Sequence, residues 1–239
     1  MTKRTPVFLA VLVLAASLAA CGSTGGNGGK DGGTDGGTPD DAYFGLTVGT
    51  CYRLVGGPGN AEQMTIGVET QNKALGYQAS EIMYRLGGLL RRTDWVTFEN
   101  GQVLIHRRED RGTPTVSVEF DPPIVFLERP ERDTGTSPIV TDTTATDVNT
   151  AATSSWHVEV ALQPATPTTV PQQTAPYDAF PVFDTYSHPS VGPDQQDRLW
   201  VVPDKGIVRA DLDGASWPDM SLDAVWQMKQ GDTTCTTGP

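Results

Sequence analysis

The sequence predicts a mainly β fold of about ten strands with at most one or two short helices. Apolar and polar residues alternate in short runs, as at Met64, Ile66 and Val68, which is the pattern of a half-buried strand. Thr, Gly and Pro are plentiful, and long stretches of Ala, Leu, Glu and Lys are scarce. This mixture favours strands and turns over helices.

Turn residues place the strands in order along the chain. Asn100-Gly101 is the strongest hairpin signal, because both residues tolerate positive φ, and Asp204-Lys205-Gly206 predicts a second tight turn. Ser221–Gln230 predicts a helix, since Leu222, Val225 and Trp226 share one face at helical spacing. The predicted strands are Cys51–Val55, Met64–Val68, Glu81–Leu86, Trp95–Glu99, Val103–Arg107, Thr115–Phe120, Ile124–Leu127, Trp156–Leu162, Pro181–Tyr186, Leu199–Val202 and Ile207–Ala210.

The chain divides into a leader, a linker and one domain. Residues 1–20 have the layout of an export signal, with a basic start, an apolar run that is short for a membrane span, and small residues at Ala19 and Ala20. Residues 21–41 are Gly-rich and polar, so we expect a disordered tether there. Residues 42–239 form the predicted β-rich domain, with mobile loops expected near 133–155 and 163–176, where Thr, Asp and Pro gather.

Leu18-Ala19-Ala20-Cys21 closely resembles the bacterial lipobox, and it stands where the apolar run ends. The resemblance implies cleavage before Cys21 and lipidation of this residue with palmitate-type acyl chains. Because Gly22 is not an aspartate, the family's sorting habit points to the outer membrane. Several acyl chains on one residue are enough for stable anchoring.

The charge of the chain excludes two classes of partner. The formal net charge is −12, and loss of the leader removes two more positive charges. Such an acidic surface repels phosphates, so we expect no nucleic acid partner and no adsorption to anionic headgroups. The membrane is therefore expected as a partner only through the anchor on Cys21.

Cys51 and Cys235 remain after lipidation and lie near the two ends of the predicted domain. Export places them in an oxidising compartment, where a pair of cysteines usually forms a disulfide, so we predict this bond. The alternative is a redox or metal-binding thiol pair, which neither a CxxC spacing nor a nearby histidine supports.

After Glu81 the chain carries a Trp-containing hairpin, the corner Asp121-Pro122-Pro123, and the segment from Trp200 to Arg209, of the type W-x-x-P-x-x-G-x-V-R. This order of elements is similar to that of exported lipoproteins with a LolA/LolB-like domain. The resemblance implies a strongly curved antiparallel sheet or half-barrel, closed on its concave side by helices, whose apolar face receives acyl chains. The segment Tyr177–Val182 lacks the Gly-Thr of those relatives, and few helical residues are available to close the sheet.

No catalytic constellation is visible, so we expect a non-enzymatic protein without cofactor or metal. His106, His157 and His188 are scattered, and the spacing around Asp211-Leu212-Asp213-Gly214 does not fit an EF-type calcium loop. The mixed-charge clusters Arg107–Arg111 and Glu128–Asp133 indicate solvated strand ends or the rim of a partner surface. The five Trp residues fit a core better than a ligand groove.

Two functions follow as expectations. The first is a membrane-anchored envelope lipoprotein whose curved β-domain binds an apolar or lipid ligand, at residues that the sequence does not identify. The alternative is an interaction subunit of an envelope complex, such as a secretion, assembly or motility machine. A carrier requires an apolar cavity, whereas an interaction subunit requires a filled interior and an exposed apolar patch.

Overall fold

The computed structural model describes residues 38–56, 62–69, 79–129, 138–170, 174–187, 195–212, 220–227 and Cys235. Within these residues one short helix and thirteen strands are formed, and the strands make one antiparallel sheet. The elements are α1 (Asp40–Tyr43), β1 (Thr50–Gly56), β2 (Glu62–Glu69), β3 (Ser80–Leu86), β4 (Leu89–Glu99), β5 (Gln102–Asp110), β6 (Val116–Glu128), β7 (Ile139–Asp147), β8 (Thr153–Leu162), β9 (Thr166–Thr168), β10 (Tyr177–Ser187), β11 (Gln195–Val202), β12 (Gly206–Asp211) and β13 (Met220–Gln227).

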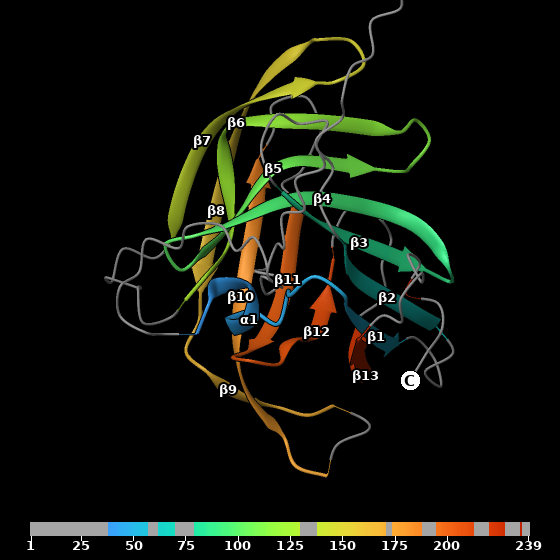
Figure 1. Ribbon diagram of the computed structural model, residues 1–239. Helices are drawn as coiled ribbons and strands as arrows, with labels where there is room; N and C mark the ends of the chain where they lie inside the picture. The colour runs from blue at the N-terminus through green and yellow to red at the C-terminus, as the bar shows by residue number, and fades with distance from the viewer. Residues whose placement is uncertain are drawn as a thin grey trace, which may run out of the picture.

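The sheet closes on itself. Its order is β11-β12-β13-β1-β2-β3-β4-β5-β6-β7-β8-β10-β9, and β10 also pairs with β11 along Phe180–Tyr186. Twelve described strands therefore form a barrel, and β9 adds a short edge outside it (Figure 1). The predicted mainly β, antiparallel fold is confirmed. The half-barrel of about ten strands is corrected to a closed barrel, because the β10–β11 ladder removes the open edges that a half-barrel would leave.

Three segments differ from their predictions. A helix was predicted over Ser221–Gln230, but residues 220–227 form strand β13, where Leu222 pairs with Leu54 of β1. Residues 139–147, expected as part of a loop outside the sheet, form β7, whose β-branched residues suit a strand. Part of 163–176 likewise forms β9 at the edge of the sheet.

At two of the predicted turns the backbone agrees with the prediction. Asn100 and Gly101 have φ of 53° and 77°, as the two-residue β4–β5 turn requires. At the β11–β12 turn, Asp204 and Gly206 have φ of 61° and 91°. The corner Asp121-Pro122-Pro123 does not end a strand but lies within the long β6.

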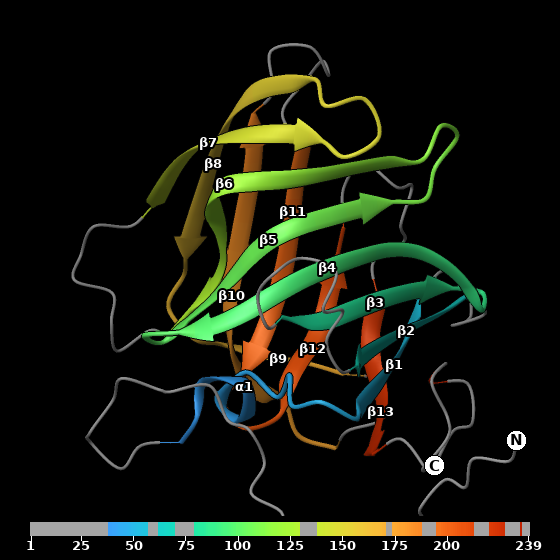
Figure 2. The ribbon, with the colours of Figure 1, turned by 45° about the horizontal axis from the view of Figure 1, so that its top comes forward.

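One apolar cluster lies inside the barrel among the described residues, and α1 lies at one end of the barrel. Phe44 and Leu46, which follow α1, are fully buried, as are Tyr52, Ile105 and Leu127 of the wall. The segment begins at Asp40, two residues inside the predicted tether. We call 39–46 the plug; Figure 2 shows its helix at one end of the barrel.

The plug is held by its ends. Asp40 accepts a hydrogen bond from the Gly101 backbone at 2.7 Å and pairs with Arg129 at 2.7 Å. The Arg129 guanidinium also lies 4.3 Å from the centre of the Tyr43 ring. On the other side, the Asp204 N–H donates to the Tyr43 carbonyl at 2.8 Å. These contacts fix the plug to the β4–β5 and β11–β12 turns.

Candidate functional site

A cluster of charged side chains lies inside the barrel, beyond the apolar cluster and toward the end opposite the plug. We call it the buried ion network; its members are Arg92 and Asp94 of β4, Arg108 and Asp110 of β5, and Asp197 of β11. Four of the five are buried, and Asp110 is 45% exposed at the side chain. Of these five side chains, only that of Asp110 is exposed to solvent.

Strand register explains how these residues come together. Asp94 stands opposite Arg108, and Arg92 stands opposite Asp110, in the β4–β5 ladder. Residues two apart on a strand face the same side, so all four point into the barrel. The β5 strand carries an irregularity between Ile105 and Arg107, which brings Arg108 to the inner face after the apolar Ile105.

The network crosses the barrel. Arg108 donates two hydrogen bonds to Asp94, at 2.7 and 3.1 Å. Arg92 donates to Asp110 at 2.9 Å and to Asp197 at 2.7 Å, while a second guanidinium, that of Arg108, lies 3.8 Å from Asp197. Because β4 and β11 are far apart in the sheet order, the Arg92–Asp197 contact joins opposite walls.

The charges of the four buried members of the network balance each other. Two buried arginines face two buried aspartates, with Asp110 at the solvent side. Burial alone would lower the pKa of Arg92, but Asp197, Asp110 and Asp94 outweigh it, so the pKa is raised. Nearby, burial and the charge of Asp94 raise the pKa of the Tyr84 hydroxyl, which stays protonated. Such paired charges brace the two walls, because separating them would leave a charge unpaired in the interior.

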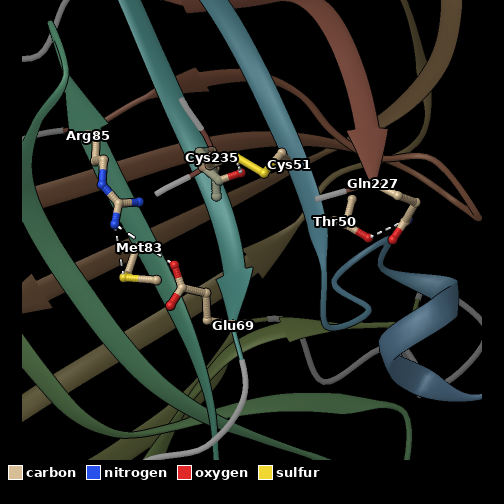
Figure 3. The surroundings of a disulfide bond; sticks show 8 residues. Thr50, Cys51, Glu69, Met83, Arg85, Gln227 and Cys235 are labelled. Carbon is tan, nitrogen blue, oxygen red and sulfur yellow. Dashed lines mark hydrogen bonds and ion pairs between the residues drawn. A yellow bond between two sulfur atoms is a disulfide. The ribbon is translucent and has the colours of Figure 1, made fainter. Parts of the chain in front are cut away.

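The predicted disulfide is present and joins Cys51 of β1 to Cys235, 184 residues later (Figure 3). Both residues are fully buried, and Cys235 lies against Gly67 of β2, where an added Cβ would approach the Cys235 Cβ to 3.3 Å. On one side of the bond, Arg85 donates to the Met83 sulfur at 3.3 Å. The disulfide thus fixes Cys235 to the β1–β2 wall.

The histidines that the structure describes lie apart from the ion network. His106 is hydrogen-bonded to Thr97 at 2.8 Å, and burial lowers its pKa. His157 lies between Asp142, 2.7 Å from Nδ1, and Glu159, 3.2 Å from Nε2. The hydrogen bond to Asp142, followed by that to Glu159, raises the pKa of His157.

The described Trp side chains lie at separate places in the barrel: Trp95 is buried, and Trp156 and Trp200 pack against the apolar cluster. Trp95 and Trp200 each stack beneath an arginine, Arg107 at 4.7 Å and Arg209 at 4.4 Å from the ring centre. Trp156 packs edge-on against Phe120, with ring centroids 5.5 Å apart. The rings are therefore dispersed instead of lining one groove.

Several predicted positions lie outside the described residues: Cys21, Gly22, His188, Asp213, Gly214 and Trp217. Asp211, the first residue of the rejected calcium pattern, ends β12 with a carboxylate oxygen 3.9 Å from Arg198. Among the side chains that the structure describes, no group of three His, Cys, Asp or Glu is arranged to hold a metal ion. None of the described residues forms a helix long and apolar enough to cross a membrane.

The buried ion network was missed by reasoning from the sequence, which interpreted Arg107–Arg111 as solvated. That interpretation is wrong for Arg108, which is 5% exposed. The alternation of Arg92, Asp94 and Val96 along β4 was the available signal, because an inward Val96 places the residues two and four before it on the same face.

Comparisons with known proteins place few limits on function. No family model matches the sequence, and no curated protein matches it significantly. One solved structure is similar, that of a candidate lipoprotein from Parabacteroides distasonis, with 12% sequence identity, a TM-score of 0.38, and coverage of 76% of this chain and 96% of that chain. Likeness at this level supports no inference about the function of this chain.

Proposed function

We propose that this chain is an exported bacterial lipoprotein, held on the cell envelope by acyl chains on Cys21. The support from sequence is the lipobox-like Leu18-Ala19-Ala20-Cys21 at the end of an apolar leader. The support from structure is the Cys51–Cys235 bond, since disulfides persist in the oxidising compartments that export reaches. Gly22 favours the outer membrane as the final location.

We further propose that the domain works as a non-enzymatic interaction module. The observation that carries this is the Arg92–Asp197 contact, which joins opposite barrel walls at 2.7 Å. An apolar ligand entering at the end opposite the plug would meet paired charges, and displacing them would be costly. At the other end, Phe44 and Leu46 already occupy the apolar interior. Binding of an apolar ligand is therefore the less favoured alternative.

The anchoring part is tested by metabolic labelling with an alkyne-bearing fatty acid in the bacterium that encodes the chain. The wild-type chain is expected in the membrane fraction with label, and the Cys21→Ser variant without label. A Cys21→Ser variant that keeps its label, or a wild type that never acquires it, would overturn the anchor.

The interaction part is tested by native mass spectrometry of the same purified chain. The expected spectrum shows the lipidated protein with no additional, noncovalently bound lipid. Stoichiometric lipid that resists detergent exchange would contradict the interaction proposal and favour the apolar-ligand alternative.

A further inference from the structure

The ladder between β6 and β7 is shorter than either strand. It pairs Val118–Asp121 of β6 with Thr144–Asp147 of β7 and stops there. The next residues of β6 are Pro122 and Pro123, which have no backbone N–H and cannot extend the ladder. Residues 139–143 of β7 therefore pair with β8 alone among the strands that the structure describes. We call residues 139–143 the open edge.

The backbone of the open edge points toward the side that β6 leaves. The Val148 N–H, just after β7, donates to the Ser117 carbonyl of β6 at 2.9 Å. Backbone groups alternate in direction along an antiparallel strand, and the β7 register is regular along its ladder with β8. Even-numbered residues of β7 therefore face the β6 side. Val140 and Asp142 thus direct two N–H groups and two carbonyls outward at the open edge.

The open edge is exposed and lacks the usual obstacles to strand pairing. Val140 is 49% exposed, and the Asp142 side chain is 82% exposed. Exposed edges are commonly blocked by proline, lysine or a β-bulge, and none of these occurs in residues 139–143. By contrast, the short edge strand β9 carries Pro167 in its centre. An added strand therefore meets none of these obstacles at the open edge.

Carboxylates border the open edge and select the charge of a partner. Asp142 lies opposite His157 in the β7–β8 ladder, with an oxygen 2.7 Å from Nδ1, and Glu159 lies 3.2 Å from Nε2. Asp121, the last β6 residue of the ladder, is also exposed. One histidine cannot neutralise three carboxylates, so the surface beside Val140 is negative whether His157 is protonated or not. A strand with basic side chains is favoured there, and the net charge of −12 favours it further.

We propose that the open edge binds an extended segment of a partner protein, which adds to β7 as a further strand. The segment places an apolar side chain beside Val140 and a basic one beside Asp142, since side chains of neighbouring strands align. This inference rests on the proposed function, because it names the surface and the partner chemistry of an interaction module. Recognition is by backbone hydrogen bonds, which distinguishes it from simple attraction between charges.

The test is an NMR titration of the full mature chain with the acetylated and amidated peptide Lys-Thr-Val-Thr-Lys. In an antiparallel register its first lysine faces Asp142 and its valine faces Val140. We expect the amide signals of Val140 and Asp142 to shift saturably. N-methylation of the first lysine and the valine removes the two N–H groups that face β7, and should weaken binding about tenfold or more. N-methylation of the two threonines, whose N–H groups point away, should leave the affinity within about threefold.

The matched variants of the chain are Val140→Pro and Val140→Thr. Proline is tolerated where a backbone N–H points out of the sheet, so Val140→Pro removes one outward donor and keeps the β7–β8 ladder. We expect it to weaken peptide binding several-fold, whereas Val140→Thr keeps the donor and should bind like the wild type. The amide signals of the rest of the domain verify that each variant is folded.

Three results would overturn the inference. Equal binding of the two N-methylated peptides would show that charge alone holds the peptide. The absence of a saturable shift at Val140 and Asp142 would remove the site. A concentration-dependent dimer that Val140→Pro abolishes would assign the open edge to a second copy of the chain. Failure here is separate from failure of the proposed function, because native mass spectrometry reports bound lipid and this titration reports strand addition.

Discussion

Replacing Asp197 by alanine is expected to destabilise the domain by about 3–5 kcal/mol. The Asp197 side chain is 2% exposed and accepts a hydrogen bond from Arg92, which is 5% exposed. Its removal leaves Arg92 paired with Asp110 at 2.9 Å, and the Asp110 side chain is 45% exposed to solvent. It also removes the opposite charge 3.8 Å from Arg108. The loss of stability is therefore the cost of leaving the buried Arg92 guanidinium without its main counter-charge.

Urea unfolding of the disulfide-intact protein measures this loss, with Asp211→Ala as the matched control. Asp211 is also paired with an arginine, Arg198 at 3.9 Å, but both side chains are over 40% exposed, so its loss should cost less than about 1 kcal/mol. A double variant, Arg92→Met with Asp197→Leu, should be more stable than Asp197→Ala, because neither charge is then stranded. Equal, small losses for Asp197→Ala and Asp211→Ala would refute the network as a brace.

Three further outcomes are expected. Cys235→Ser opens the 184-residue disulfide loop and should lower the free energy of unfolding by up to about 5 kcal/mol, measured by urea titration; an unchanged midpoint would contradict the clasp. Gly206→Ala should destabilise the domain by at least about 2 kcal/mol more than Gly87→Ala. Both glycines have positive φ, but only at Gly206 would an added Cβ clash with the Tyr52 hydroxyl and the plug backbone. Equal urea midpoints for the two variants would refute that packing. In Asp142→Asn, the raised pKa of His157 should fall toward its ordinary value, as followed by NMR. Because the pKa of His157 is raised in the folded state, its ion pairs stabilise the fold fully at pH values below the unfolded-state pKa. This stabilisation is lost as the pH rises through the folded-state pKa.

The elements that the sequence predicted best are those fixed by local chemistry. Asn100-Gly101 and the turn ending at Gly206 require positive φ, so residue type alone located two hairpins. Alternation located strands such as β2, where Met64, Ile66 and Val68 are buried. Pairing of the two cysteines followed from their number and the expected compartment.

What sequence reasoning missed depends on contacts between distant strands. Leu222 and Val225 fit one face of a helix at the local level. In the structure Leu222 pairs with Leu54, 168 positions earlier, and the backbone hydrogen bonds between β13 and β1 stabilise a strand instead. Closure through Phe180 and Val201 likewise has no local signal. The ion network was missed because charged residues were equated with solvent exposure, although two buried arginines opposite two buried aspartates can share an interior.

The most direct test of the central claim is an intact-mass measurement of the mature chain extracted from membranes. The account predicts a chain that begins at Cys21, carries thioether-linked and amide-linked acyl groups, and contains one disulfide between Cys51 and Cys235. A mature chain that retains residues 1–20, or that begins elsewhere without acyl groups, would contradict it.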